Sequence, residues 1–422
     1  MGNGTVVGLR GIPAPIWALG FVSMFMDISS EMIHALLPAY LVGVMGASVF
    51  AVGIIEGIAE ATASIVKVFS GALSDWLGKR KVLAVAGYGL AALTKPIFPL
   101  GATIGWIAAA RFIDRVGKGL RGAPRDALVA DLAPPALRGA SFGLRQSLDT
   151  IGAFTGPGLA IALMWLTSDH YQTVFWIAVI PAVASVALLQ FGVQEPERSK
   201  PAQAPRWPLR LSELKRLGNV FWIVTGAATL FTLARFSEAF LLLKAQGAGL
   251  PVALLPGVLV IMNVVYTIVA YPAGRLSDRT NRINVLTIGL LLLIAADVLL
   301  AIDGGLAVVV AGVALWGAHM GFTQGLLSAL LADAALPELR GTAFGIFNLI
   351  SGLALLVASV AAGALWQRFG ASATFLSGAA LTVIALLSLA AIRHALPHLG
   401  NPPQAEVSGR DAIPAQQGQP RR

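Results

Sequence analysis

The stretch Gly71-Ala-Leu-Ser-Asp-Trp-Leu-Gly-Lys-Arg-Lys81 separates two long apolar runs and decides how the rest of the chain is interpreted. It combines glycines, one carboxylate and three consecutive cations in a chain with little other charge. A second stretch, Gly274-Arg-Leu-Ser-Asp-Arg-Thr-Asn-Arg282, repeats its Gly-x-Leu-Ser-Asp core, and Asp278 follows Asp75 after 203 residues. Because this offset is close to half of the chain, the repeat indicates two halves built alike.

The composition is that of a membrane protein. Of 422 residues, 56% are hydrophobic and 12% are charged, whereas a soluble domain carries about 25% charged residues. The mean hydropathy of +0.77 agrees, so we predict a polytopic membrane protein. The absence of cysteine excludes disulfides, thiolate catalysis and cysteine metal sites. We interpret the net charge of +9 as a marker of the cytoplasmic side, not as a nucleic-acid signal.

Twelve segments can span a bilayer, which takes about 20 mainly apolar residues. We therefore predict an all-α polytopic fold of 12 transmembrane helices in two six-helix bundles. The segments are 15–42, 48–72, 82–101, 104–131, 141–165, 172–193, 219–244, 251–272, 284–302, 306–331, 342–366 and 371–393.

One long connection divides these spans six and six. Residues 194–218 are rich in proline and charge, which is typical of a linker. We expect a first bundle over 1–193, a cytoplasmic linker over 194–218 and a second bundle over 219–396. The tail from 397 to 422 is rich in proline, glutamine and glycine, and we predict that it is disordered and cytoplasmic.

The distribution of Lys and Arg predicts the orientation. One set of connections holds most of the loop cations, including 79–81, Arg138 and Arg340, whereas the alternate set holds only Arg368. Because cytoplasmic loops carry the excess of Lys and Arg, we expect both termini and the linker in the cytoplasm. The expected location is the cell (inner) membrane.

Two further matches support duplicated halves. The pattern Ala-Asp131-x3-Pro-x2-Arg-Gly-x2-Phe-Gly143 aligns without a gap on Ala-Asp333-x3-Pro-x2-Arg-Gly-x2-Phe-Gly345, 202 residues later. The pair Ser-Glu31 matches Ser-Glu238 at an offset of 207. Six plus six spans in parallel repeat is the layout of one large class of transporters.

These stretches resemble signatures of the major facilitator superfamily, over roughly residues 15–393. The Gly71–Lys81 stretch resembles the family's signature between spans two and three, with Trp76 where the family usually has arginine. Arg115-Val-Gly-Lys-Gly119 resembles its fourth-span pattern. The fifth span resembles a pattern associated with antiporters, without its trailing Gly-Gly, at Gly143, Gly152, Gly156 and Pro157. The resemblance implies alternating access by two rocking halves, and the fifth-span pattern favours proton-coupled efflux.

Charged residues inside spans are costly, so each is a functional candidate. Apart from Asp131 at the very end of the fourth span, the first five spans hold seven acids and eight Lys or Arg. This near balance favours internal ion pairs, although the sequence offers no partner for Lys95. The stripes cannot face lipid, so we expect them to pair or to line a water-filled cavity. The candidates for substrate contact and proton coupling are Asp27, Glu31, Glu56, Glu60, Arg111, Asp114, Arg115, Arg235 and Glu238.

The repeated loops are expected to form a cytoplasmic gate. Gly71 and Gly78 would allow a tight turn and close helix approach. Asp75 would accept hydrogen bonds at a helix N-terminus or pair with Arg121 or Arg125, and these contacts would break as access alternates. The gate residues are Gly71, Asp75, Gly78, Arg80, Arg121, Arg125, Asp126, Gly274, Asp278 and Arg279. In the fifth span, we expect Gly152, Gly156 and Pro157 to permit close packing and bending.

The predicted function is secondary transport, in which protons are exchanged for a drug-like or toxic organic solute. Because the fourth span is rich in cations, the alternative is a transporter of a small anion, organic acid or metal complex. A membrane enzyme is a remote alternative, since only His394 and His398 have ligand-like spacing. The chain contains no ATP-binding Gly-x4-Gly-Lys-Ser/Thr stretch, so the sequence does not predict a primary pump. We expect a monomer without cofactor or metal, whose partners are substrate, protons and lipid and not nucleic acid.

Overall fold

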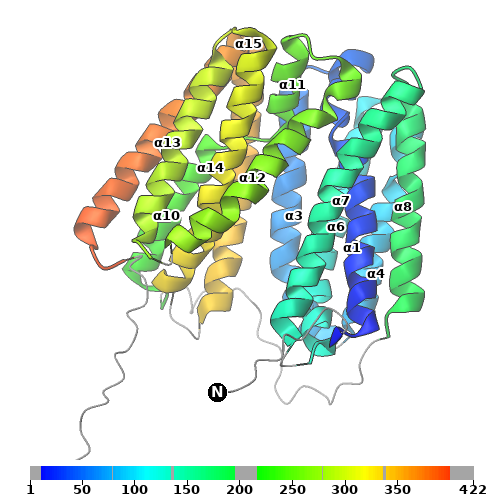
Figure 1. Ribbon diagram of the computed structural model, residues 1–422, viewed down its shortest axis with the longest axis horizontal. Helices are drawn as coiled ribbons and strands as arrows, with labels where there is room; N and C mark the ends of the chain where they lie inside the picture. The colour runs from blue at the N-terminus through cyan, green and yellow to red at the C-terminus, as the bar shows by residue number, and fades with distance from the viewer. Residues whose placement is uncertain are drawn as a thin grey trace, which may run out of the picture.

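The computed structural model describes residues 11–77, 79–134, 137–194, 216–277, 279–335 and 339–399, which form helices and loops and no strand (Figure 1). The predictions for Gly78, Asp278, most of the linker and the tail beyond Leu399 concern residues outside this set. The backbone of Asp75 lies in a helix, but its side chain is also outside the described part.

The first half of the chain supplies the helices on the right of Figure 1. They are α1 (Ala14–His34), α2 (Leu37–Ala39), the π-helix η2 (Tyr40–Val44), α3 (Val49–Leu77), α4 (Arg80–Thr94), α5 (Ile97–Leu100), α6 (Ile104–Leu132), α7 (Arg138–Leu166) and α8 (Tyr171–Gly192). Within this half, α1 packs on α7 and α8, and α6 packs on α3 and α4.

The second half supplies the helices on the left of Figure 1. They are α10 (Gly218–Ala234), α11 (Ala239–Gly247), the 3-10 helix η4 (Val252–Leu254), α12 (Pro256–Ser277), α13 (Arg282–Ala301), α14 (Gly305–Ala334) and α15 (Arg340–Ala395). Here α14 packs on α12 and α13, and α15 packs on α10 and α13. The two halves meet mainly along α3 and α15 and along α7 and α12.

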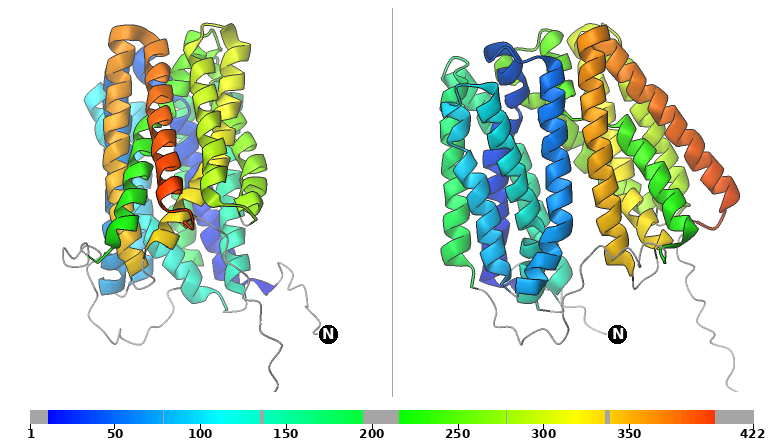
Figure 2. Two further views of the ribbon diagram at one scale, coloured as in Figure 1. Left: turned by 90° about the vertical axis from the view of Figure 1, so that its left-hand side faces the viewer. Right: turned by 180° about the vertical axis from the view of Figure 1, so that it is seen from behind.

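Twelve membrane spans result, as predicted. Ten described helices are long and apolar enough to cross a membrane. The 29-residue α6 is a further span, whose many charges lower its hydropathy. Helix α15 supplies two spans, because its backbone turns back at Gly370, where φ is 84°. Figure 2 shows its two arms, orange and red, joined at their upper ends.

The internal repeat is visible as a repeated ion pair. Arg80 at the start of α4 donates a hydrogen bond to Asp131 at the end of α6, at 2.7 Å. Arg282 at the start of α13 contacts Asp333 near the end of α14 in the same way. Both members of the second pair follow those of the first by 202 residues, so the two halves repeat this contact as well as the sequence motif.

Close packing of α7 on α1 requires two of the fifth-span glycines. A Cβ atom at Gly152 would lie 2.7 Å from the carbonyl oxygen of Met24, and one at Gly156 would lie 2.8 Å from that of Ile28. Alanine at either position would therefore push α7 away from α1. At Gly143 an added Cβ would meet no atom within 4 Å.

The prediction of a tight turn at Gly71 is wrong. Helix α3 continues to Leu77, so Gly71 lies inside the helix, and a Cβ there would make an ordinary 3.5 Å contact with Ala123. Gly274 likewise lies inside α12, with open space around it. The turns after these glycines come only once each helix has ended.

The two halves share an apolar layer at one end of the molecule. We call the end where α8 finishes and α10 begins the linker face, and the other end the opposite face. Near the opposite face, Leu36 and Leu41 of the first half belong to one buried cluster with Ala239, Leu243 and Ala253 of the second. This layer joins the halves there and excludes water between them.

Candidate functional site

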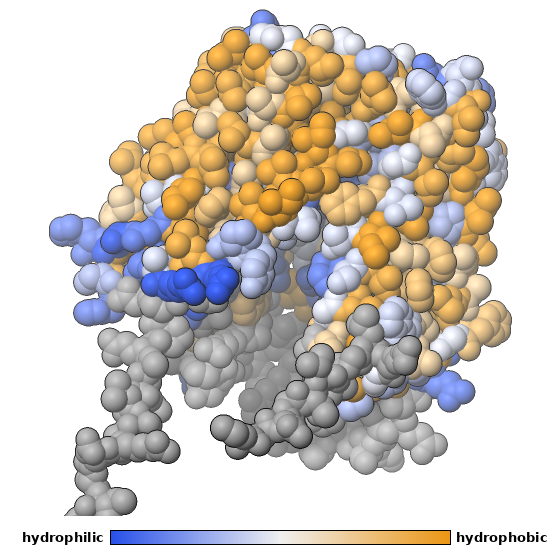
Figure 3. Space-filling model, in the orientation of Figure 1, coloured by the Kyte–Doolittle hydropathy of each residue, from blue (hydrophilic) through white to orange (hydrophobic). Residues whose placement is uncertain are grey.

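A cavity of about 470 Å³ lies between the two halves. Its wall is formed by α1, α3, α6 and α7 of the first half and by α12 of the second. Figure 3 shows the surface hollowed between the halves toward the linker face, which is at the lower edge of the view. The polar lining residues are Asp27, Glu31, Glu60, Ser64, Lys67, Lys118, Arg121, Arg125, Gln146, Asp149, Thr150, Asn263, Tyr266 and Thr267.

The cavity is closed toward the opposite face. There α7 and α12 approach each other, since a Cβ at Gly257 would lie 3.9 Å from the Cδ1 atom of Ile161. Helices α3 and α15 are also in close contact, since a Cβ at Gly53 would lie 2.5 Å from the carbonyl oxygen of Ser359. Together with the apolar layer, these contacts leave the linker face as the open side.

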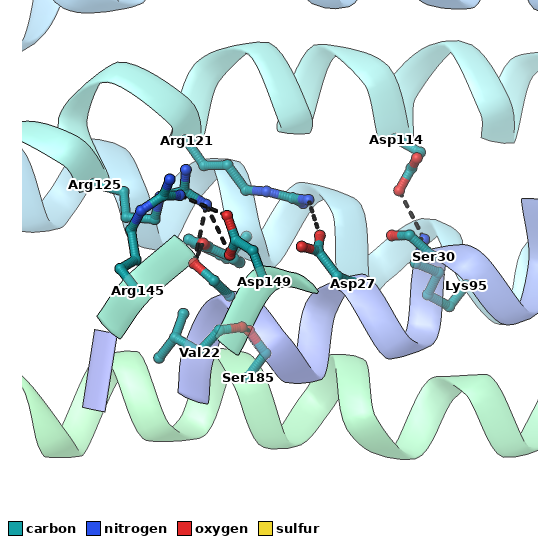
Figure 4. A network of polar contacts seen from close by, with 12 residues as sticks. Val22, Asp27, Ser30, Lys95, Asp114, Arg121, Arg125, Arg145, Asp149 and Ser185 are labelled. Atoms are coloured by element: carbon teal, nitrogen blue, oxygen red, sulfur yellow. Dashed lines mark hydrogen bonds and ion pairs between the residues drawn. The ribbon is translucent and has the colours of Figure 1, made fainter. Parts of the chain in front are cut away.

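Two lining acids come from α1, which carries Asp27 and Glu31 one turn apart. The Asp27 carboxylate lies 3.9 Å from the Arg121 guanidinium, as Figure 4 shows. The Glu31 carboxylate lies 3.5 Å from Nδ1 of His34. Both side chains remain about a quarter exposed, at 28% and 26%. Both carboxylates therefore make only weak ion pairs, and water in the cavity can reach them.

The other two lining acids have cations behind the cavity wall. Glu60 of α3 lies 3.2 Å from the guanidinium of Arg115. Asp149 of α7 accepts a 2.6 Å hydrogen bond from Arg145 one turn earlier, and Arg125 lies 3.9 Å from its other oxygen (Figure 4). Neither Arg115 nor Arg145 lines the cavity. These ion pairs join α3, α6 and α7 in the first half.

A second layer of charge lies deeper and is sealed. Arg111 of α6 donates two hydrogen bonds to the carboxylate of Glu56, and the two side chains are only 3% and 1% exposed. Nε2 of His34 lies 3.7 Å from the same carboxylate, so His34 bridges Glu56 and Glu31. A proton on this imidazole could therefore interact with both acids.

The partner of Lys95 is Asp114. The Lys95 ammonium donates hydrogen bonds to Asp114 at 2.8 Å and to the hydroxyl of Ser30 at 3.1 Å (Figure 4). Lys95 directly follows the end of α4, one residue before Pro96, and keeps helical backbone angles. The pair joins α1, α4 and α6 inside the first half and does not reach the cavity.

Two residues predicted for the gate lie in the cavity wall. Arg121 stacks over the ring of Tyr88, at 4.8 Å from its centroid, and faces Asp27. Arg125 donates hydrogen bonds to Asp126 and to Ser23 at 3.1 and 2.9 Å. Both arginines are thus held by neighbours in the first half, well before the end of α6.

The other described gate residues lie at the linker face. Arg80 pairs with Asp131 and also donates a hydrogen bond to the carbonyl oxygen of Ala127 at 2.7 Å. Arg279 is exposed in the turn after α12.

A separate ion pair lies at the opposite face. The Lys244 ammonium donates a hydrogen bond to the Asp303 carboxylate at 2.9 Å, and this hydrogen bond holds the pKa of the exposed carboxyl below its usual value.

Arg235 and Glu238 lie at a break in the seventh span. Helix α10 ends at Ala234 and α11 begins at Ala239. The backbone N–H of Ser237 donates a hydrogen bond to the hydroxyl of Ser359 across this break, at 3.2 Å. Glu238 interacts electrostatically with His34 and Glu31 of the other half. Neither Arg235 nor Glu238 belongs to the cavity lining.

The structure thus brings three of the nine predicted coupling residues, Asp27, Glu31 and Glu60, into the cavity wall. Prediction from the sequence did not assign Lys67 and Lys118 to the site, although both belong to the charged stripes of their spans. It also missed Asn263, Tyr266 and Thr267 of α12, because neutral polar residues in a span give little signal. Among the described residues, no group of three His, Asp or Glu is arranged to hold a metal.

Comparisons with known proteins agree with this architecture. The model of the Major Facilitator Superfamily matches residues 19–359 and again 258–417. An uncharacterised MFS-type transporter of Methanocaldococcus jannaschii is 31% identical over 394 residues, which cover 90% of this chain and 95% of the relative.

Solved structures show the same fold. The nucleoside transporter NupG superposes with a TM-score of 0.76 at 14% identity, over 89% of this chain and 99% of its own. A POT family transporter in complex with 5-aminolevulinic acid also gives a TM-score of 0.76, at 12% identity and over 92% and 98% of the two chains.

Proposed function

Because this chain belongs to the Major Facilitator Superfamily, it is a secondary transporter of small molecules, and we propose that it exports its substrate in exchange for protons. The cavity is the substrate site in one of the two alternating states. The observation that supports this proposal is the cavity itself, which holds water-accessible acids and is open at one face only. Members of a transporter fold with this layout alternate by rocking one half against the other.

The orientation of the cavity is proposed from the loop cations, and the direction of transport from the fifth-span pattern associated with antiporters. The described linker face carries Lys79, Arg80, Lys81, Arg279 and Arg282. Cytoplasmic loops of membrane proteins carry the excess of Lys and Arg, so we place this face in the cytoplasm and the chain in the inner membrane as a monomer. The cavity then faces the cytoplasm, and a substrate enters it from inside the cell.

The proton exchange is assigned to Asp27 and Glu31. Both acids line the cavity and have a cationic group at more than 3.4 Å, so a proton can replace that group without breaking a short ion pair. When Asp27 binds a proton, its attraction for Arg121 is lost, and one of the contacts that hold α1 on α6 is weakened. When Glu31 binds a proton, its attraction for His34 is lost, and His34 remains beside Glu56. Protonation from outside would thereby favour return of the empty carrier.

The proposal is tested in proteoliposomes by the direction of the pH gradient that drives transport. In an antiporter, an acidic lumen drives accumulation of substrate as protons leave, whereas in a symporter an acidic exterior does so. Candidate substrates come first from growth of an overexpressing strain on drugs, metalloids and organic anions. We expect accumulation with an acidic lumen and its loss in Asp27→Asn and Glu31→Gln.

The control is Asp303→Asn, which removes an exposed acid at the opposite face, far from the cavity lining. It should transport as the unmodified protein does. Accumulation driven by an acidic exterior would show that the protein is a symporter and would contradict the proposed antiport. Gradient-independent movement unaffected by the Asp27 and Glu31 variants would remove the coupling assignment altogether.

A further inference from the structure

Ion pairing in the first half leaves two cations over. Each acid within the first five spans has its own basic partner at 3.9 Å or less. The pairs are Asp27–Arg121, Glu31–His34, Glu56–Arg111, Glu60–Arg115, Asp114–Lys95, Asp126–Arg125 and Asp149–Arg145. Asp131, at the end of the fourth span, pairs with Arg80 outside the spans, and His34 counts as a cation when it is protonated. Lys67 and Lys118 remain. No ion pair within 4 Å and no side-chain hydrogen bond joins either ammonium group to a described residue, and the acids Glu60, Glu31 and Asp27 attract Lys118 only from a longer distance.

Both lysines lie on the same part of the cavity wall. Helices α3 and α6 are in close contact at Val66 and Gly119, where a Cβ added to Gly119 would lie 2.7 Å from the Cβ of Val66. Lys67 and Lys118 are the residues next to this crossing point, they are exposed, and both line the cavity. Two neighbouring helices therefore present one free ammonium group each to the same water-filled space.

The part of the cavity wall contributed by the second half carries no charge. Its polar residues are Asn263, Tyr266 and Thr267 of α12, and α7 adds the neutral Gln146 and Thr150 beside Asp149, which is paired with Arg145. The neutral side chains can donate or accept hydrogen bonds but cannot neutralise an ammonium group. Of the polar groups in the cavity, only the two lysines are charged without an ion-pair partner among the described residues.

We propose that Lys67 and Lys118 bind the substrate and that this substrate is a small organic dianion, such as a dicarboxylate or a phosphate monoester. The inference rests on the proposed function, since it assumes that this cavity is the transport site. Two ammonium groups can pair with two negative charges, while Asn263, Tyr266 and Thr267 bind the uncharged part by hydrogen bonds. A cationic substrate would instead have to displace an arginine or a histidine from its acid.

The binding test needs no gradient. Purified protein in an uncharged detergent is titrated with succinate, glucose 6-phosphate, acetate and tetraphenylphosphonium at constant ionic strength, and binding is measured from the shift in unfolding temperature. We expect at least one of the two dianions to bind and the monoanion and the cation not to. Lys67→Gln and Lys118→Gln should each weaken binding roughly 10- to 100-fold, as expected for loss of a charged hydrogen bond.

Two kinds of control keep this test specific. Lys67→Arg and Lys118→Arg keep the charge and should bind within a few-fold of the unmodified protein, which excludes misfolding as the cause of the loss. Arg393→Gln removes an exposed cation at the end of α15, outside the cavity lining, and should leave binding unchanged. An equal loss in Arg393→Gln would show a general effect of net charge and would overturn the proposal.

The remaining outcomes separate this proposal from proton-coupled export. Binding of tetraphenylphosphonium in preference to both dianions, dianion binding that survives both glutamine variants, or no binding of either dianion at millimolar concentration would each overturn it. Proton-driven export of another solute could still be observed in these cases. Conversely, lysine-dependent dianion binding without any response of transport to a pH gradient would support the substrate site and reject the proton coupling.

Discussion

The guanidinium of Arg111 donates two hydrogen bonds to the carboxylate of Glu56, at 3.2 and 2.8 Å, inside a membrane-spanning bundle. Both side chains are almost fully buried, and His34 lies beside the same carboxylate at 3.7 Å. Because this pair is sealed from the cavity, we assign it to holding α3 against α6. The weaker pairs of Asp27 and Glu31, which the cavity reaches, are the ones assigned to coupling.

Breaking this pair from one side should destabilise the protein. Glu56→Gln leaves Arg111 buried without a compensating charge, and such changes typically cost about 3–5 kcal/mol. We expect a clear fall in the unfolding temperature of the purified protein in detergent. The double variant Glu56→Gln with Arg111→Met, which removes both charges, should recover much of the loss. Equal stability of Glu56→Gln and the unmodified protein would contradict the structural role.

The packing of α7 on α1 gives a prediction with a control in the same helix. Gly156→Ala places a methyl group 2.8 Å from the carbonyl oxygen of Ile28, so α7 must move away from α1. Gly158→Ala points into open space, and alanine is about 1 kcal/mol better than glycine in a helix. We expect a lower unfolding temperature for Gly156→Ala and an unchanged or higher one for Gly158→Ala. The reverse order would show that α1 and α7 do not pack as described.

An unpaired acid is buried in the second half. Asp297 of α13 is fully buried, and neither of its carboxylate oxygens has a hydrogen-bond partner among the described residues. A charge buried without a partner is costly, so Asp297→Asn, which keeps the shape, should raise the unfolding temperature. Asp169→Asn, at an exposed acid in the loop between α7 and α8, should leave it unchanged. A lower unfolding temperature for Asp297→Asn would show that the carboxyl group makes a contact that asparagine cannot replace.

The absence of cysteine from the chain permits a clean cross-linking test of the two states. Ile161 and Gly257 are adjacent where α7 and α12 close the cavity toward the opposite face. Cysteines at these two positions, joined by a short bifunctional thiol reagent, should lock the cavity open at the linker face and abolish transport. Each single-cysteine variant treated in the same way should remain active. Full transport by the cross-linked protein would mean that α7 and α12 do not separate during the cycle.

The positions of the spans could be predicted from the sequence because apolar length alone decides them. The expected segment 104–131 and helix α6 (Ile104–Leu132) agree closely, even though α6 is the most charged helix. The break between α10 and α11 could not be predicted, because no proline or glycine lies between Arg235 and Glu238. It is stabilised instead by a contact between Ser237 and Ser359, which are distant in sequence.

The charged residues of the site could be found from the sequence, but their partners could not. Lys95 pairs with Asp114 on another helix, and only the crossing of α4 and α6 brings the two together. Likewise, the stripe on α6 contains paired and unpaired cations at similar spacing. Whether a cation such as Lys118 is left free depends on which acids the neighbouring helices place opposite it. The positions of these acids relative to the cation are decided by the tertiary structure and cannot be taken from the sequence of one helix.

The most direct test of proton coupling compares two transport modes in the same proteoliposomes. Exchange of labelled for unlabelled substrate without a gradient requires only that the loaded cavity alternates between the two faces. Accumulation driven by an acidic lumen requires in addition that protons are exchanged at Asp27 and Glu31. We predict that Asp27→Asn and Glu31→Gln keep exchange and lose pH-driven accumulation. If both variants accumulate substrate as the unmodified protein does, the assignment of coupling to these acids is contradicted.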